Sequence, residues 1–275
     1  MKLAVSNLAW DDSETDQIIS LFTNKHVSAI EIAPSKVWPI PLNAEEEQLK
    51  HFRSNLRSRG ISIIALQSIL YNQNHLGIFE NEQVRQELIS YMKGIIRLAS
   101  YLGAGAIVFG SPRNRKVGKL DAARALAIAL DFFRNIADTA EEYGVTICIE
   151  PNPIVYDCDF LTTFNETIEF VREANHKAIK INVDTGAFML NYEDPKALLD
   201  GCLSHIGHLH ISEPFLQPIG SSELSLTYHQ KVADSLLSIG YNGWISIEMK
   251  SGLIGSNLEL VQRAVELAQS IYSIT

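Results

Sequence analysis

Short apolar segments alternate with longer amphipathic segments along the whole chain, and this alternation constrains the fold more than any other feature. Eight segments have the composition of buried strands: 2–7, 29–34, 61–67, 105–111, 146–151, 179–184, 207–212 and 244–249. Between them lie amphipathic helical patterns, among them 45–60, 81–103, 120–144 and 161–175. Eight such units in 275 residues fit a closed parallel barrel better than an open doubly wound sheet. The sequence therefore predicts an α/β fold, a single (β/α)8 TIM barrel, with one domain over 1–275.

Composition and charge exclude several classes of partner. Hydrophobic residues make up 46% of the chain, which suits a sizeable core. The formal net charge of -9 disfavours the phosphate backbone of nucleic acids and anionic membrane surfaces. The cysteines have neither metal nor redox spacing, and no segment has the pattern of a signal peptide or a membrane span. We therefore expect a cytoplasmic protein with no nucleic-acid or membrane partner, and homo-oligomerisation stays open.

Four consecutive strands in the second half of the chain share one alternation pattern. Each has one fully apolar face and one largely polar face, because successive side chains of a strand point to opposite sides. The apolar face suits a surrounding helix layer, so the polar face must line the barrel interior. Each polar row ends, at the carboxyl end of its strand, in an ionisable residue: Glu150, Asp184, His210 or Glu248. Barrel enzymes carry their chemistry at this end.

These four residues predict a metal centre. Three carboxylates that converge in a barrel mouth repel one another strongly unless a positive charge lies between them. A divalent cation is the simplest partner, and separate salt bridges, for instance to Lys180 or Lys250, are the alternative. One imidazole with three carboxylates favours Mn²⁺ or Mg²⁺ and also admits Co²⁺ or Zn²⁺. His208 lies one layer deeper than His210, so we expect it to be a hydrogen-bonded interior residue and not a ligand.

Four short segments resemble the xylose isomerase-like TIM-barrel superfamily: CIEPNP (148–153), NVDTG (182–186), HLHISE (208–213) and SIEM (246–249). The likeness is greatest to its sugar epimerase and isomerase branch, which includes D-tagatose 3-epimerase. The resemblance implies that a divalent metal is bound by Glu150, Asp184, His210 and Glu248, with the two glutamates as the acid/base pair. It also implies that Glu213 lies near the sugar. His229 stands where some members have a polar site residue, and a helix cap or surface position is its alternative.

Two departures from the family pattern concern the substrate. The family often reads Asp-Thr-x-His after strand six, whereas Ala187 takes the place of that histidine here. The epimerases commonly follow strand seven with an arginine and a Pro-Gly-x-Gly turn, and the segment 214–225 has neither. We expect the gap beside Ala187 to be filled by another side chain, with His229 as the candidate, or by a larger substrate group. The metal site is thus better supported than a ketose 3-epimerase activity.

A site of this kind suits the deprotonation of a carbon atom next to a carbonyl group. A metal that chelates the carbonyl and an adjacent hydroxyl acidifies the C–H bond, and carboxylates on its two sides can remove and return the proton. Glu150 and Glu248 are the candidates for these roles. Other strand ends offer candidate substrate contacts: Asn7, Glu31, Gln67 and Arg113. For Arg113, a position in a solvated loop is the alternative.

The leading interpretation is a metal-dependent isomerase or epimerase whose partner is a small-molecule sugar or sugar derivative. If the proton returns to a β-hydroxyl leaving group, the same site is a lyase that resembles 3-dehydroshikimate dehydratase. A non-catalytic sugar-binding barrel is the third interpretation. A nuclease resembling endonuclease IV is disfavoured, because that enzyme needs more histidines and a charge of -9 disfavours DNA.

Overall fold

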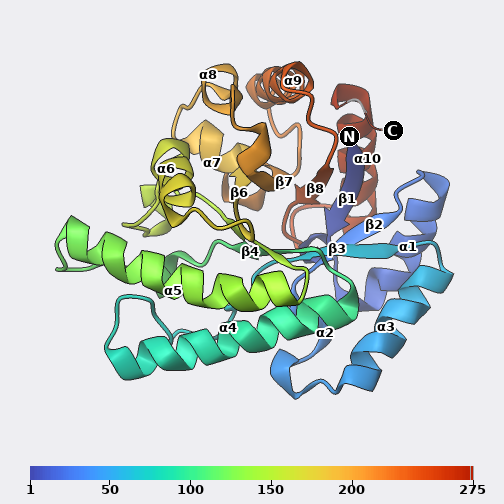
Figure 1. Ribbon diagram of the computed structural model, residues 1–275. Helices are drawn as coiled ribbons and strands as arrows, with labels where there is room; N and C mark the ends of the chain where they lie inside the picture. Colours follow the sequence, from blue (N-terminus) through green and yellow to red (C-terminus); the bar gives the residue numbers. More distant parts are fainter. Residues whose placement is uncertain (273, 275) are drawn as a thin grey trace.

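Eight parallel strands close into a barrel in the computed structural model, which describes residues 1–272 and 274 (Figure 1). Strands that follow one another in the chain are also neighbours in the sheet, and the first pairs with the last to close it. This arrangement confirms the predicted (β/α)8 TIM barrel. The strands are β1 (Lys2–Ser6), β2 (Ala29–Ile32), β3 (Ser62–Leu66), β4 (Ala106–Phe109), β5 (Thr146–Ile149), β6 (Ile179–Asp184), β7 (Ile206–Ser212) and β8 (Trp244–Glu248).

The helices surround this barrel, and the long helices α4 (Glu82–Leu102) and α5 (Ala122–Glu142) lie side by side (Figure 1). Helix α6 (Phe164–Ala174) begins directly after Thr163, whose side chain accepts a hydrogen bond from the Glu166 main-chain N–H at 3.2 Å. The helices of the described part are α1 (Thr15–Asn24), α2 (Pro34–Val37), α3 (Glu46–Ser58), α4 (Glu82–Leu102), α5 (Ala122–Glu142), α6 (Phe164–Ala174), α7 (Thr185–Leu190), α8 (Pro195–Leu199), α9 (Glu223–Ser238) and α10 (Asn257–Ile271).

The buried apolar residues form an outer and an inner group. The outer group joins the outward faces of the strands to the helices, and it includes the edge-to-face rings of Phe109, Phe132 and Phe133. The inner group is small and comes mainly from the first four strands: Ala4, Ala29, Ile64, Ala65, Ala106, Val108 and Cys148. Because most of these side chains are short, the barrel interior has room for the larger polar side chains of β6 to β8.

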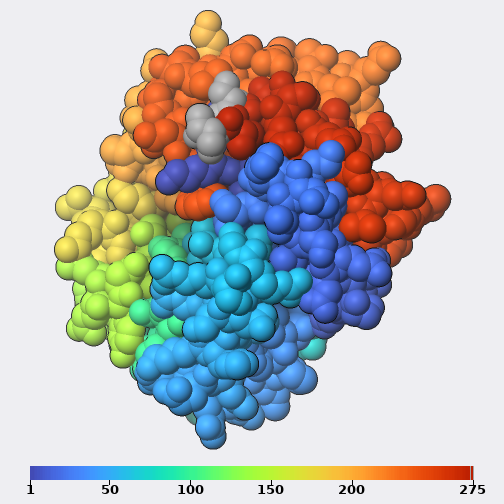
Figure 2. All heavy atoms as spheres, turned by 90° about the vertical axis from the view of Figure 1, so that its right-hand side faces the viewer, coloured from blue at the N-terminus to red at the C-terminus, as the bar shows by residue number. Residues whose placement is uncertain are grey.

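The first and last elements of the described chain lie side by side where the barrel closes. Figure 2 shows the N-terminal segments, in blue, directly beside the C-terminal segments, in red. Lys25, at the end of α1, forms an ion pair with Glu266 of α10, with 2.6 Å between Nζ and Oε1. None of the helices in residues 1–272 has both the length and the apolar character needed to cross a membrane.

Candidate metal centre

The four predicted ligands meet at the carboxyl ends of the last four strands. Parallel pairing places Asp184 of β6 beside His210 of β7, and Ser212 of β7 beside Glu248 of β8. Glu150 follows β5 directly. One donor atom from each of the four side chains can be chosen so that all of them lie within 4.8 Å of one another. Such a set is compact enough to surround a single ion.

The Nδ1 atom of His210 faces the three carboxylates. It lies 3.0 Å from Oε1 of Glu150 and 3.4 Å from Oε2 of Glu248. The Oδ2 atom of Asp184 is 3.9 Å away. The His210 side chain is only 1% exposed, so the surrounding strands fix the direction in which the ring presents this nitrogen.

Hydrogen bonds hold Asp184 in one orientation. Its Oδ1 atom accepts a hydrogen bond from the Ala187 N–H at 2.6 Å and so caps helix α7, while Oδ2 accepts one from Ser212 Oγ at 2.7 Å. The Gly186 N–H donates to the same Ser212 oxygen at 2.9 Å. A side chain at position 186 would meet this serine and the Glu213 main chain at 3.0 Å or less, so the close approach requires glycine.

Glu150 is held more tightly than Glu248. Its carboxylate accepts hydrogen bonds from the Asn182 amide at 2.7 Å and the Asn152 amide at 3.3 Å. The buried guanidinium of Arg115 donates to the Glu150 main-chain oxygen at 2.8 Å. Within the described chain, the one polar contact of the Glu248 carboxylate is with His210. One of the two glutamates is therefore fixed by neutral donors, and the other is freer to move.

The electrostatics of the cluster indicate a shortage of positive charge. Burial and the charges of Glu150 and Glu248 raise the pKa of Asp184 to about 7. Burial also raises the pKa of Glu248, although His210 opposes the shift. Burial acts in the same direction on Glu150, but the hydrogen bond and charge of His210 outweigh it and lower the pKa of Glu150.

The single imidazole carries the compensating charge. Burial lowers the pKa of His210, but the neighbouring carboxylates, Glu31 first among them, outweigh burial and raise that pKa well above its usual range. Lys180, a possible salt-bridge partner, donates instead to the main-chain oxygen of Ser204 at 2.5 Å. The donor types, their distances and the surplus of negative charge fit a divalent cation.

A cavity of about 580 Å³ opens over the four residues. Three of the expected substrate contacts, Gln67, Arg113 and Glu213, line it together with Ala187. Asn7 is not among the described residues that line this cavity. Its Oδ1 atom accepts a hydrogen bond from the Ala33 N–H at 2.7 Å, so the side chain ties the loop after β1 to the end of β2.

His229 lies against Glu213 and is not among the described residues that line the cavity. Its fully buried ring places Nδ1 2.7 Å from the Tyr272 hydroxyl and Nε2 3.4 Å from Oε1 of Glu213. Because the ring is fully buried in the middle of α9, the alternative of a surface or cap position is wrong. That His229 fills the gap at Ala187 stays a prediction. The packing of α9 against the C-terminal residues turns the ring towards the far side of Glu213, where it supports that carboxylate.

The sequence did not predict the positions of two other residues of the site, Glu31 and Tyr156. Glu31, expected as a substrate contact, is fully buried beneath His210, with both carboxylate oxygens 3.1 Å from Nε2. His208 lies beside it, 2% exposed, with Nε2 3.3 Å from Oε1 of Glu31, in keeping with an interior role. Tyr156 was missed: its ring packs edge to face on Phe215, and its hydroxyl accepts the Phe215 N–H at 2.9 Å. The aromatic residue soon after the CIEPNP segment was the only available signal.

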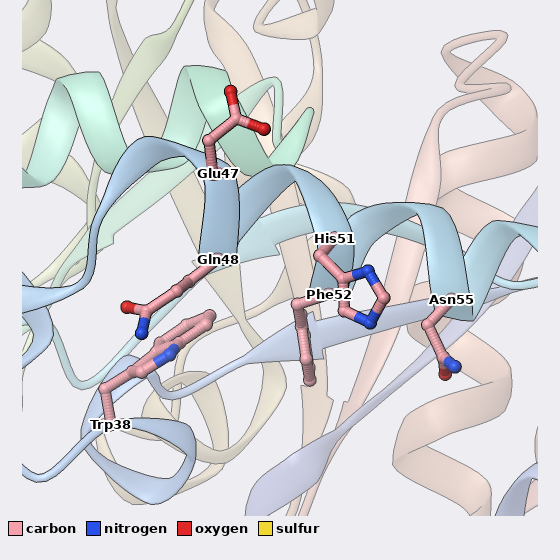
Figure 3. Close-up of a pocket in the computed structure, with 6 residues that line it drawn as sticks. All are labelled: Trp38, Glu47, Gln48, His51, Phe52 and Asn55. Carbon is pink, nitrogen blue, oxygen red and sulfur yellow. The ribbon is translucent and has the colours of Figure 1, made fainter.

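Another pocket lies outside the barrel mouth, between Trp38 and helix α3 (Figure 3). The Trp38 ring packs edge to face against Phe52, with 5.2 Å between ring centroids, and His51 lies next to Phe52 on the same helix. None of the four clustered ionisable residues lines this pocket. The barrel mouth is therefore the candidate site.

Comparisons with known proteins agree with this geometry. The family model of the xylose isomerase-like TIM barrel matches residues 26–271. A D-psicose 3-epimerase of Ruminiclostridium cellulolyticum is 27% identical over 139 residues, which are 48% of this chain and 45% of that protein. The chain thus aligns with about half the length of this curated relative.

Solved structures resemble the chain over its whole length. A D-psicose 3-epimerase from Clostridium cellulolyticum H10, solved with D-tagatose, has a TM-score of 0.78 and 17% identity, and the match covers 98% of this chain and 99% of that one. An IolI protein with a bound zinc atom has a TM-score of 0.78 and 20% identity, with 100% of both chains covered. These likenesses establish the fold, and the family match establishes that the chain belongs to the xylose isomerase-like TIM-barrel family.

Proposed function

We propose that this chain is a divalent-metal-dependent isomerase or epimerase of a sugar or sugar derivative. The observation that carries the proposal is the convergence of one imidazole and three carboxylates within 4.8 Å, under a cavity of about 580 Å³. The names of its relatives agree with this reaction class, and one structural neighbour holds zinc. The substrate is proposed as a class, because the curated relative aligns over only about half its length.

The cation would be held by Glu150, Asp184, His210 and Glu248. Three oxygen donors favour Mn²⁺ or Mg²⁺, and the imidazole also admits Co²⁺ or Zn²⁺. When bound, a divalent cation polarises the carbonyl of a sugar and an adjacent hydroxyl, which acidifies the C–H bond beside the carbonyl.

Glu150 and Glu248 are the proposed acid/base pair. They project from β5 and β8, which β6 and β7 separate, so they approach a substrate from different directions. Their pKa values shift in opposite directions, downward for Glu150 and upward for Glu248, so the two carboxylates have different surroundings. Removal of a proton by one and its return by the other would invert the carbon or move the carbonyl.

The remaining substrate contacts follow from the lining of the cavity. Gln67 offers an amide, Arg113 a guanidinium and Glu213 a carboxylate, which together can bind several hydroxyl groups. Tyr156 and Phe215 form an aromatic wall from the loops after β5 and β7. Asn7 and His229 would act through the neighbours that they hold, Ala33 and Glu213.

The test is a turnover assay in deuterated water. Protein stripped with EDTA and reloaded with Mn²⁺, Mg²⁺, Co²⁺ or Zn²⁺ would be incubated with ketoses, aldoses and hydroxylated keto acids. We expect a metal-dependent isomer or epimer that carries deuterium at the carbon next to the carbonyl, provided that the proton exchanges with solvent. Loss of water from the substrate would identify a lyase, and binding without turnover or exchange would identify a sugar-binding barrel.

The same assay tests the acid/base pair. Replacing either Glu150 or Glu248 by glutamine should lower the rate by several orders of magnitude. The matched control is Glu169→Gln, an exposed glutamate on α6, which should leave the rate unchanged. Near-normal rates in both site variants, with cation still bound, would contradict the proposed mechanism.

A further inference from the structure

A buried carboxylate lies on the closed side of the candidate metal centre. Glu31 is in the middle of β2, and its side chain is fully buried in the barrel interior. Both of its carboxylate oxygens are 3.1 Å from Nε2 of His210. Because β1 and β8 separate β2 from β7 in the closed sheet, this contact crosses the barrel interior. The ring of His210 is thus held between two acidic groups, with one nitrogen facing each.

The two ring nitrogens of His210 face chemically different surroundings. Nδ1 faces the cluster that opens to the cavity, whereas Nε2 faces Glu31 in the sealed interior. A neutral imidazole carries its proton on one nitrogen and a lone pair on the other. Carboxylates accept hydrogen bonds, so each side of the ring suits a proton. A cation held by the carboxylates on the Nδ1 side would take the place of a proton there, and the proton on Nε2 would stay, facing Glu31.

We propose that Glu31 is a positioning residue that accepts the Nε2–H of His210 and thereby presents the Nδ1 lone pair to the cation. The inference rests on the proposed metal-dependent function and deepens it. Without this acceptor, a proton on Nδ1 would be favoured, because Oε1 of Glu150 lies 3.0 Å away and would accept its hydrogen bond. That tautomer has no lone pair directed at the cation. Carboxylates that orient a ligating histidine in this way commonly change metal affinity by about 10- to 100-fold when they are replaced.

Glu31 also belongs to a second possible metal site, which the test must distinguish from the positioning role. Glu31, His208 and His210 themselves form a compact group of potential ligands. A second cation there would need the Nε2 lone pair of His210 and would make its ring a bridge between two ions. The positioning role instead requires one cation per chain and a proton on Nε2.

The test measures cation binding and ring coordination and does not depend on turnover. Isothermal titration with Mn²⁺ compares the wild type with Glu31→Gln, which has nearly the same shape and one acceptor oxygen, and Glu31→Leu, which has none. We expect one ion per wild-type chain, an affinity about 10- to 100-fold lower for Glu31→Leu, and an intermediate value for Glu31→Gln. The matched control is Ser246→Ala, because Ser246 is also buried inside the barrel, beside His210, and its hydroxyl has no partner in the described chain.

A second measurement needs no substitution and therefore does not depend on the variants folding. Nitrogen-15 NMR of the Zn²⁺-loaded wild type should show His210 coordinated through Nδ1 and protonated on Nε2. Coordination through Nε2, equal affinities for the three Glu31 proteins, or two ions per wild-type chain would each overturn the inference. Failure of the wild type to bind any of the four cations would overturn the proposed metal centre itself, so the two failures are distinguishable.

Discussion

Replacing Asp184 by asparagine should stabilise the metal-free protein and remove most of its cation affinity. Burial and the charges of Glu150 and Glu248 raise the pKa of Asp184 to about 7. Above that pH, folding therefore buries the negative charge of Asp184 beside two other negative charges. Asparagine has nearly the same shape and no charge. The substitution therefore relieves the repulsion without leaving a cavity, and it deprives the cation of one anionic ligand.

The size of the effect follows from the linkage between proton binding and folding. The pKa of Asp184 is higher in the folded chain than its ordinary value of 3.8, so the folded state binds the proton more tightly and loses stability as the pH rises from 3.8 to about 7. A shift of about 3 pKa units, at about 1.4 kcal/mol each, is about 4 kcal/mol near pH 8. Loss of the hydrogen bond from Ser212 Oγ costs about 1 kcal/mol. Asp184→Asn should then raise the free energy of unfolding by about 3 kcal/mol near pH 8. At pH 5 this gain should be smaller by about 2 kcal/mol or more.

Urea denaturation followed by circular dichroism, in EDTA between about pH 5 and pH 8, measures this gain. Asp194→Asn is the matched control, because Asp194 also caps a helix through the Lys196 N–H but is exposed and contacts none of the four ligands. With Mn²⁺ added, the wild type should gain stability and Asp184→Asn should gain little. If the difference between Asp184→Asn and the wild type does not grow with pH, Asp184 is not under the repulsion described.

Three other predictions concern the site and the core that supports it. His210→Ala should lower Mn²⁺ affinity more than about 100-fold in calorimetry, because a lost ligand costs more than a lost supporting contact, and unchanged affinity would refute the assignment. Gly110→Ala should weaken Mn²⁺ binding, because its methyl group would collide with the Glu150 carboxylate. Gly105→Ala is the control, because a methyl group there meets nothing within 4 Å. Equal Mn²⁺ affinities of the two variants would mean that Glu150 moves aside at no cost. Phe133→Ala should lower the free energy of unfolding by about 3–5 kcal/mol in urea, because its buried ring packs on Phe109, Phe132 and Phe170, and a loss below about 1 kcal/mol would contradict this packing.

The barrel and the four clustered residues were predictable because both depend on strand geometry alone. A period of two assigns each strand residue to the inside or the outside of the barrel, whatever the loops do. A parallel barrel then brings the carboxyl ends of all its strands to one rim. Glu150 and Glu248 therefore meet, although 97 residues lie between them in the sequence. The inner position of His208 follows from the same period.

The positions that His229, Asn7 and Glu31 take depend on geometry that a single sequence does not contain. His229 lies on α9, and which way a helical side chain points depends on how the helix is rotated against its neighbours. Packing against Tyr272 decides this rotation, and the partner is 43 residues away. Asn7 follows its strand in a short 3-10 turn, where its amide oxygen accepts the Ala33 N–H, and it is not among the described residues that line the cavity. Contacts across the barrel, such as that of Glu31, depend on the stagger of the strands, which composition does not reveal.

His210 links two parts of the site that have different surroundings. Among the described residues, it alone belongs to both groups of potential ligands. On one side of its ring, the side chains of Glu150 and Glu248 are 16% and 14% exposed and border the cavity. On the other side, the side chains of Glu31 and His208 are only 0% and 2% exposed. Under the proposed function, substitutions on the sealed side change cation affinity without touching a substrate, whereas substitutions at Glu150 or Glu248 change cation binding and proton transfer together. Comparing the two kinds of variant separates the part of the rate that comes from holding the cation from the part that comes from moving the proton.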